Sequence, residues 1–435
     1  MTTTPNPVTG VLVARTEPLP AAEVANLLQL LPDIDARSLT AWVRRGEGVV
    51  GWGRALEFTA RGANRFEDAS RWWRSWCDKA IVRDAVGLPG TGPLAFGSMT
   101  YAGASAAESV LIVPEVLIGR RGDRAWITTV TTDGSLPVGA SVSAPVGLSQ
   151  PPQAPQNVTF ADGPKSPTVW ANAVAEAVER IGTSRLDKVV LARSLGAVAS
   201  QRLDPRWILQ RLAEQYDNTW VFAVDGLVGA TPEMLVRLDR GLVTSRVLAG
   251  TIRRTGDDAR DLGLAASLAR SSKDLEEHEY AVRSVADALE PHCSSTNVPE
   301  SPFVLHLTNV MHLATDVAGV VGDDSTSLGL AASLHPSAAV CGTPTDLADT
   351  VITELEGLDR RRYAAPVGWM DASGDGEWGI ALRCGELDES DPRALTLYAG
   401  CGIVAGSDPE AEVAESDAKF LPMRDALTAT RVRPA

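Results

Sequence analysis

Tight turns between short apolar runs constrain the fold of this chain more than any other feature of its sequence. Residues 219–250 (TWVFAVDGLVGATPEMLVRLDRGLVTSRVLAG) hold three or four such runs, with turns expected at Asp225-Gly226 and at residues 239–241. Residues 363–404 hold a similar hairpin. A two-residue turn joins antiparallel strands, whereas parallel strands need a long crossover. We therefore expect antiparallel sheet in both parts of the chain.

Other segments show the apolar spacing of helices or the continuous apolar runs of strands. Helices are expected over residues 66–86, 169–181, 204–216, 260–291 (with a break near Ser271-Ser272), 327–334 and 345–360. Strands are expected over residues 51–58, 94–101, 110–118, 125–131, 187–199 and 308–321. Residues 1–132 are expected to form an N-terminal α/β portion, and residues 133–167 form a loop rich in Pro, Ser and Gly. Residues 168–435 then form the core of the same large domain.

The net charge, the cysteine spacing and the lengths of the apolar runs argue against several classes of protein. A net charge of −15 over 435 residues argues against a nucleic-acid or anionic-membrane surface, so an anionic substrate would need local positive charge from lysine, arginine or a metal ion. The five cysteines lack C-x-x-C and zinc spacing, as expected for reduced thiols. No apolar signal segment and no run of 18 apolar residues occurs. We expect a soluble, cytoplasmic protein with no membrane segment, and the absence of phosphate-binding glycine motifs disfavours a nucleotide enzyme.

Residues 398–420 (YAGCGIVAGSDPEAEVAESDAKF) combine a strand end with a helix that carries acidic residues. We expect a small-residue turn at residues 400–402, a second turn at 406–409 and a helix after it. On that helix, Glu412, Glu415 and Lys419 lie at i, i+3 and i+7, on one face. Such a face offers two oxygen ligands for a hard divalent cation and a cation for a substrate carboxylate. The plainer interpretation is a solvated face with one Glu415–Lys419 ion pair.

Four further residues have the chemistry of a buried site. Lys188 opens an apolar strand, where desolvation would favour the neutral amine that a general base requires. Glu233 precedes an alternating strand, and burial would raise its pKa and make it a proton donor. Arg383 is expected on the return strand of the hairpin that turns at residues 373–376, and an arginine there needs an anionic partner. Glu277 lies in the acidic start of a helix. Each residue also has a plainer structural interpretation as a surface or turn charge.

Ordered motifs through residues 168–425 resemble the chorismate-utilising enzymes, and among these the isochorismate synthases. The matching stretches are DKVVLARS, GATPEML, LAGTIRR, SSKDLEEHE, MHLAT, LHPSAAVCGTP, YAAPVGW, GEWGIALRC and YAGCGIVAGSDPEAEVAESDAK. The front 130 residues match only loosely. The resemblance implies an α+β fold of the anthranilate synthase component I type, with large antiparallel sheets stacked face to face and helices outside them.

The resemblance also implies a role for each motif residue. Lys188 would activate water for attack at C2 of chorismate, and Glu233 would protonate the leaving C4 hydroxyl. Glu277 and Glu415 would hold Mg²⁺, with Glu412 and Glu276 as weaker candidates acting through water. The implied substrate contacts are Gly250, Thr251, His312, Ala339, Arg383, Gly400, Gly402 and Lys419. The implied protein is a monomer or homodimer without an obligatory glutaminase subunit.

Four alternatives are weighed on sequence alone. Salicylate synthases share the lysine and also eliminate pyruvate, and they tend to carry threonine where this chain has Ala339. Anthranilate synthases add ammonia and usually lack a lysine like Lys188, so an amidotransferase-dependent subunit is disfavoured. Aminodeoxychorismate synthases of one type carry a nucleophilic lysine where this chain has Ala249. A non-catalytic binding protein on the same fold would have lost the base, the acid or a metal ligand, and the chain retains all of them.

Overall fold

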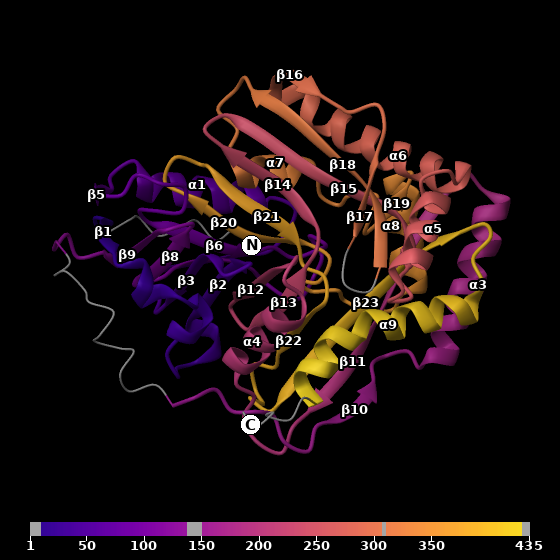
Figure 1. The fold of residues 1–435 in the computed structure, drawn as a ribbon, viewed down its shortest axis with the longest axis horizontal. Helices are drawn as coiled ribbons and strands as arrows, with labels where there is room; N and C mark the ends of the chain where they lie inside the picture. The colour runs from indigo at the N-terminus through magenta and orange to yellow at the C-terminus, as the bar shows by residue number, and fades with distance from the viewer. Residues whose placement is uncertain (1–9, 137–149, 307–309, 429–435) are drawn as a thin grey trace.

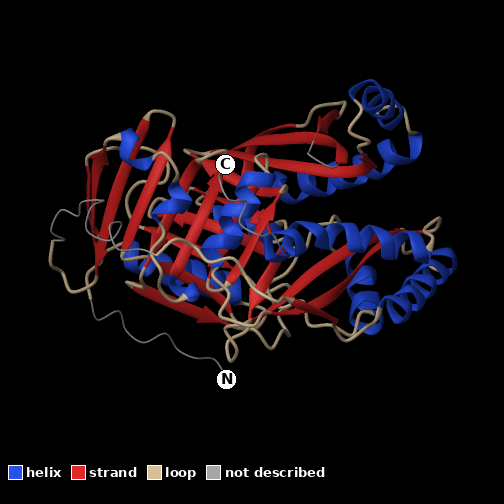
Figure 2. Ribbon diagram, turned by 60° about the horizontal axis from the view of Figure 1, so that its bottom comes forward, coloured by secondary structure: helices blue, strands red, loops and turns tan. Residues whose placement is uncertain are grey.

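The computed structural model describes residues 10–136, 150–306 and 310–428, which form two large sheets packed face to face (Figures 1 and 2). The larger sheet runs, in spatial order, β10 (Thr159–Asp162), β11 (Lys188–Val198), β23 (Ala394–Val404), β22 (Cys384–Leu387), β13 (Leu227–Thr231), β12 (Trp220–Val224), β2 (Leu39–Arg44), β3 (Glu47–Trp52), β8 (Val116–Arg121), β9 (Arg124–Thr131), β1 (Val13–Leu19) and β5 (Ile81–Asp84), with β19 (Gly342–Thr343) beside β11. The smaller sheet runs β16 (Cys293–Asn297), β18 (Val310–Val321), β15 (Leu242–Arg253), β14 (Met234–Asp239), β21 (Gly376–Ile380), β20 (Pro366–Asp371), β6 (Leu94–Ser98), β7 (Ser109–Val113) and β4 (Leu56–Ala60), with β17 (Phe303–His306) beside β18.

Helices cover the outer faces and the ends of these sheets (Figure 2). The α-helices are α1 (Arg65–Cys77), α3 (Pro167–Thr183), α4 (Pro205–Gln215), α5 (Asp258–Leu268), α6 (Ser272–Leu289), α7 (Ser327–Ser333), α8 (Thr345–Leu355) and α9 (Pro409–Thr428), and the 3₁₀ helices are η1 (Ala21–Val24), η2 (Leu27–Leu30), η3 (Ala36–Ser38) and η4 (Glu290–His292). Helices α3, α8 and α9 pack on β11 and β23, and α5 and α6 pack on β15 and β18 (Figure 1). The expected fold of stacked antiparallel sheets with outer helices is confirmed.

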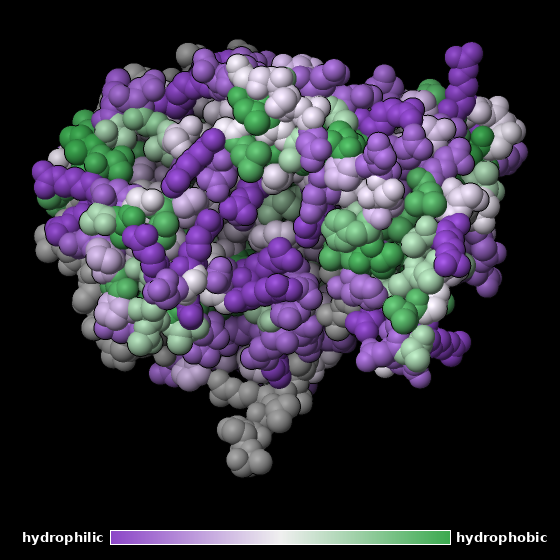
Figure 3. Space-filling model, turned by 45° about the horizontal axis from the view of Figure 1, so that its top comes forward, coloured by the Kyte–Doolittle hydropathy of each residue, from purple (hydrophilic) through white to green (hydrophobic). Residues whose placement is uncertain are grey.

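The core lies between the two sheets, where Trp42, Phe96, Phe222 and Trp378 are fully buried. In each sheet the strands of residues 13–131 lie together on one side and the strands from later in the chain lie together on the other, and the two groups meet at one strand pair. In the larger sheet β2 pairs with β12, and in the smaller sheet β6 pairs with β20. The surface in Figure 3 is mostly hydrophilic, with hydrophobic residues in scattered patches. No described helix combines the length and apolar character that a membrane crossing needs.

Four of the connections between the two sheets are only two or three residues long, and they lie in two adjacent pairs. One pair joins residues 53–55 to residues 114–115, where Ala55 N donates to Val113 O at 2.9 Å. The second pair joins residues 232–233 to residues 381–383. Two predictions were wrong because of these crossings. The segments 51–58 and 110–118 were each expected to form one strand, but each is divided between a strand of the larger sheet and a strand of the smaller sheet. Arg383 likewise belongs to a crossing and not to the return strand, which ends at Ile380.

Three other predictions were wrong because tertiary pairing overrode local pattern. The helix expected over 66–86 ends at Cys77, since Ile81–Asp84 pairs with β1 as a strand. The loop over 133–167 contains an edge strand, β10, on β11, while its residues 137–149 lie outside the described chain. The turn expected at residues 400–402 does not exist, because β23 pairs with β11 without a break from Lys188–Val404 to Val198–Ala394. The predicted helix break at Ser271-Ser272 is confirmed, with Ser271 capping α6.

Candidate active site

Lys188 is the first residue of β11, and it pairs with Val404 while its side chain extends over the diagonal neighbour Gly402. In the β11–β23 ladder, Val190 pairs with Gly402. A Cβ atom at Gly402 would lie 2.8 Å from Lys188 Cε and 3.4 Å from its Nζ. The aliphatic arm of Lys188 therefore runs over Gly402, and the side chain remains partly exposed. The glycine serves close approach of a side chain and not the turn that the sequence suggested.

Glu233 occupies the crossing from β13 to β14 and is held through its backbone. Ile380 N donates to Glu233 O at 3.1 Å, and Glu233 N donates to Thr231 Oγ1 at 3.2 Å. Burial raises the pKa of the Glu233 carboxyl to about 7, although the positive charges of Lys188, Arg383 and Lys419 act in the opposite direction. Those three cations therefore lie within electrostatic reach of Glu233. A carboxyl with this pKa is substantially protonated at neutral pH and can act as a general acid.

Arg383 lies in the adjacent crossing, from β21 to β22. Its φ of 48° is left-handed, and its carbonyl accepts a hydrogen bond from Ala230 N at 3.2 Å. Backbone hydrogen bonds therefore hold the two crossings side by side, so Glu233 and Arg383 lie near each other although 150 positions separate them in the sequence. Among the described side chains, Arg383 forms no ion pair, and it stays partly exposed. Its guanidinium can therefore donate hydrogen bonds to the carboxylate of a ligand.

His312 and Gly250 come from the opposite sheet. The β15–β18 register shifts at Gly250, whose φ is 73°, so that Thr251 pairs with His312. Burial, together with the charges of Arg383 and Lys419, lowers the pKa of His312 to about 4, although a hydrogen bond with the Gly250 backbone opposes this shift. His312 is therefore neutral at pH 7 and adds no charge to the site. The side chain of Thr251 lies outside the described part of the structure.

Helix α9 brings its acidic face against β23. Lys419 Nζ donates to Gly400 O at 2.9 Å and pairs with Glu415 Oε1 at 2.6 Å. The ligand atoms of Cys401, Glu412 and Glu415 all lie within 4.8 Å of one another. The Glu415–Lys419 ion pair of the plainer interpretation is present, and Glu415 stays half-exposed while Glu412 is partly buried beside it.

The donor set of this cluster fits a hard cation. Burial raises the pKa of Glu415, but the nearby charges of Lys419 and Arg383 outweigh burial and hold that pKa below its ordinary value. Burial and the neighbouring Glu415 raise the pKa of Glu412. Burial raises the pKa of the Cys401 thiol to about 12, so the sulfur stays protonated and is a poor ligand. Two carboxylates remain, and oxygen ligands suit Mg²⁺ or Ca²⁺ better than softer metals.

Not every residue implied by the resemblance has a described place in this site. Glu276 is exposed on α6, and no described contact joins it to the carboxylates of α9. The backbone of Glu277 belongs to α6, but its side chain lies outside the described part of the structure. Ala339 lies partly exposed in the loop between α7 and β19. Electrostatic interactions therefore connect Lys188, Glu233, Arg383 and His312 with Glu415 and Lys419 of α9, whereas no described interaction connects α6 to this group.

Sequence reasoning missed two features of the site. Cys401 packs against Glu412 and Glu415, a contact that only the sheet–helix packing creates. Glu356 and Arg360 form a buried ion pair at 2.6 Å and hold β11, because Ala192 N donates to Glu356 at 2.8 Å and Arg360 donates to Val190 O at 2.7 Å. Their i, i+4 spacing at a helix end looks like a surface pair, so no local signal distinguishes it.

Comparisons with known proteins identify the family to which this chain belongs. The family model described as "Chorismate binding enzyme" matches residues 5–428. Isochorismate synthase DhbC of Bacillus subtilis is 41% identical over 273 residues, which cover 60% of this chain and 68% of that relative. A crystal structure titled as a putative 2,3-dihydroxybenzoate-specific isochorismate synthase, DhbC from Bacillus anthracis, superposes with a TM-score of 0.74 at 32% identity, covering 92% of this chain and 98% of the other.

The fold extends further than the sequence similarity. Anthranilate synthase component I from Streptococcus pneumoniae superposes with a TM-score of 0.68 over 88% of this chain and 92% of the other, at 19% identity, which shows a shared fold. The family model spans both sheets and the motifs that carry Lys188, Glu233 and Glu415. The chain belongs to the family of chorismate-binding enzymes.

Proposed function

We propose that this protein is an isochorismate synthase, which adds water at C2 of chorismate and expels the hydroxyl at C4 as the ring double bonds shift. The observation that carries this proposal is the environment of Glu233, a carboxyl with a pKa raised to about 7 within reach of Lys188, Arg383 and Lys419. Hydroxide is a poor leaving group, so the reaction needs an acid at C4 and a base at C2. The names of the relatives support the same activity.

Lys188 is the proposed base. In its neutral form the amine would take a proton from the water that attacks C2, and each such proton transfer contributes a typical factor of about 10²–10⁴. Gly402 leaves the space in which the lysine arm lies. Glu233 is the proposed acid, and its proton would pass to the departing C4 oxygen. Lys188 lies on the larger sheet and Glu233 lies in the crossing from that sheet to the smaller one, so the two groups could flank the ring.

Chorismate carries two carboxylates, and the proposed contacts supply the positive charge that an acidic protein otherwise lacks. Arg383 and Lys419 would bind carboxylate oxygens, and neutral His312 would contribute a hydrogen bond. The glycines Gly250, Gly400 and Gly402, with Thr251 and Ala339, would line the remaining surface. Glu415 and Glu412, with Glu277 and Glu276 from α6, would hold Mg²⁺, which would supply Lewis-acid polarisation of a substrate carboxylate.

The test is product analysis with chorismate as the sole organic substrate, with and without Mg²⁺. We expect isochorismate, formed reversibly, and no pyruvate. Lys188→Ala and Glu233→Gln should each lower kcat by at least about 100-fold with chorismate binding largely retained. Lys79→Ala, which removes an exposed lysine, is the matched control and should be neutral. Unchanged turnover in Lys188→Ala would remove the base assignment.

Other products would identify other functions. Salicylate and stoichiometric pyruvate would make the protein a salicylate synthase. Turnover that depends on ammonia or on a copurifying glutaminase would indicate an amidotransferase-dependent subunit. Binding of chorismate without any product would indicate a non-catalytic protein on this fold.

A further inference from the structure

Strand β11, which begins at Lys188, lacks a continuous partner strand along one of its edges. On one edge β23 pairs with it over its whole length. On the other edge β19 pairs with Lys188 and Val189, and β10 pairs with residues 195–198. Within the described chain, no strand pairs with residues 190–194 on that edge, and these residues are buried. A buried backbone group without a hydrogen-bond partner costs free energy, so this stretch needs other partners.

The buried ion pair that follows α8 supplies two of these partners. Ala192 N donates to Glu356 Oε2 at 2.8 Å. Val190 O accepts a hydrogen bond from Arg360 Nη2 at 2.7 Å. Two further hydrogen bonds join the side chains to each other, from Arg360 Nε to Glu356 Oε1 at 2.8 Å and from Nη2 to Oε2 at 2.6 Å. Glu356 and Arg360 thus take the place that a neighbouring strand would have between β19 and β10.

The same arginine also holds the loop that leads into β19. Arg360 Nη1 donates to Val340 O at 2.7 Å. Three residues further along the chain, Thr343 of β19 pairs with Lys188. One guanidinium therefore fixes two segments that flank Lys188, because it binds β11 two residues after the lysine and binds the loop before the lysine's partner strand.

The ion pair is almost completely buried. The side chains of Arg360 and Glu356 are 2% and 1% exposed. Burial alone would lower the pKa of Arg360, but the charge and the hydrogen bonds of Glu356 raise it above its ordinary value, so the guanidinium stays charged. Replacing a buried ion pair by well-packed apolar residues is often neutral or stabilising. Overall stability therefore does not account for this pair, whereas the fixed position of the backbone around Lys188 does.

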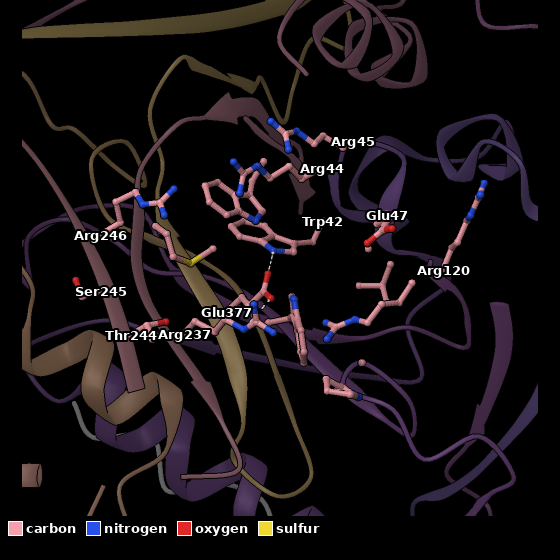
Figure 4. Close-up of a pocket in the computed structure, with 18 of the residues that line it drawn as sticks. Trp42, Arg44, Arg45, Glu47, Arg120, Arg237, Thr244, Ser245, Arg246 and Glu377 are labelled. Atoms are coloured by element: carbon pink, nitrogen blue, oxygen red, sulfur yellow. Dashed lines mark hydrogen bonds and ion pairs between the residues drawn. The ribbon is translucent and has the colours of Figure 1, made fainter. Parts of the chain in front are cut away.

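We propose that Glu356 and Arg360 are positioning residues for Lys188, an inference that rests on the function proposed above. No described hydrogen bond joins the pair to the side chains proposed to bind chorismate or the metal. The cavity between the two sheets, which Figure 4 shows, is lined by neither residue. The effect of the pair on the reaction therefore passes through the backbone of β11. A shift of about 1 Å at a reacting group can cost about 100-fold in rate.

The test measures kcat, KM for chorismate and thermal unfolding in variants of the full-length protein. Arg360→Lys keeps the positive charge but cannot donate to Glu356 and to both backbone carbonyls at once, because an ammonium lacks the planar fork of a guanidinium. We expect kcat for isochorismate formation to fall by about 10–100-fold while KM changes by less than about threefold, since Arg383 and Lys419 stay in place.

A double variant separates positioning from stability. Glu356→Leu combined with Arg360→Met replaces the pair by apolar side chains and should retain a cooperative thermal unfolding transition. The double variant removes the hydrogen bonds to β11, so kcat should fall as in Arg360→Lys. Arg206→Lys is the matched control. Arg206 is also 2% exposed and forms two hydrogen bonds with Asp204, away from β11, so this variant should lose stability and keep kcat.

Hydrogen exchange measured by mass spectrometry gives a readout that does not depend on turnover. The backbone amides of residues 190–194 should exchange at least about tenfold faster in Arg360→Lys and at the wild-type rate in Arg206→Lys. Unchanged exchange in Arg360→Lys would show that the pair does not hold β11 and would overturn the proposal.

The kinetic outcomes separate this inference from the proposed function. Isochorismate formation by the wild type, together with full kcat in folded Arg360→Lys or in the double variant, refutes the positioning role alone. An equal loss of kcat in Arg206→Lys, or a rise in KM with unchanged kcat in Arg360→Lys, also overturns it. A wild type that forms no isochorismate refutes the proposed function, and the positioning role with it.

Discussion

Replacing Gly402 by alanine tests whether the rate of the reaction depends on the position of the Lys188 side chain. The new Cβ would lie 2.8 Å from Lys188 Cε, whereas carbon atoms in contact prefer about 3.5–4.0 Å. The lysine arm must therefore move by roughly 0.7–1.2 Å, and its Nζ moves with it. A misplacement of about 1 Å at a reacting group can cost about 100-fold in rate. We expect kcat to fall by about 10–100-fold.

The fold should tolerate this substitution. Gly402 lies within β23 and is not one of the glycines with positive φ, and the atoms that the new methyl group meets belong to a flexible side chain. Alanine is favoured over glycine in a strand interior by roughly 0.5–1 kcal/mol, which offsets the contact. Thermal unfolding should therefore change little. Gly196→Ala on β11 is the matched control, because its Cβ would meet only Ala161 O, at 3.7 Å.

The assay is chromatographic quantification of isochorismate from purified variants over a range of chorismate concentrations. A fall in kcat with a stable fold in Gly402→Ala, and normal values in Gly196→Ala, would support the base assignment. Full kcat in folded Gly402→Ala would refute the argument that Lys188 is positioned across this glycine. A rise in KM alone would also contradict it, because it would mean that the methyl group only obstructs the substrate.

Three further predictions concern the acid, the metal and the core. Because the pKa of Glu233 is raised to about 7, its acid form is lost as pH rises, so kcat should fall about tenfold per pH unit above roughly pH 8; a flat profile of kcat from pH 6 to 9 would argue against this acid. Glu415→Gln should raise the Mg²⁺ concentration that gives half-maximal activity by at least about tenfold, because loss of a supporting ligand partner typically costs that much in metal affinity. Glu410→Gln changes an exposed glutamate of the same helix and should leave that Mg²⁺ concentration unchanged. Arg360→Met leaves Glu356 buried without its cation and should lower the free energy of unfolding in denaturant titrations by about 3–5 kcal/mol; a loss below about 1 kcal/mol would mean that the pair is solvated.

Short sequence patterns correctly predicted those helix starts and turns that depend only on residues a few positions away. Ser271 caps α6 through its own side chain, and the turn at Asp225-Gly226 takes the positive φ values that Asp and Gly accept. Motif identity also placed Lys188 and Glu233 among the candidates, because their neighbours in sequence are distinctive. These conclusions needed no knowledge of which strand lies beside which.

Predictions failed where a distant segment decided the conformation. The sequence around Gly400 and Gly402 looks like a turn, yet eleven consecutive pairs with β11 keep it extended, and Gly402 instead leaves space for Lys188. The apolar run 110–118 looks like one strand, but its two halves pair with different sheets. Hydrogen bonding to a partner strand outweighs local turn preference, and the partner cannot be identified from the run itself.

The amino-acid sequence by itself determined the strand-and-turn alternation, the helix starts and the chemical identity of the residues that can move protons or bind anions. Only the tertiary structure decided that two sheet crossings bring Glu233 and Arg383 together. The reason is that turns and caps depend on contacts within a few residues, whereas the proximity and the pKa values of groups far apart in the chain depend on sheet register and on burial from water.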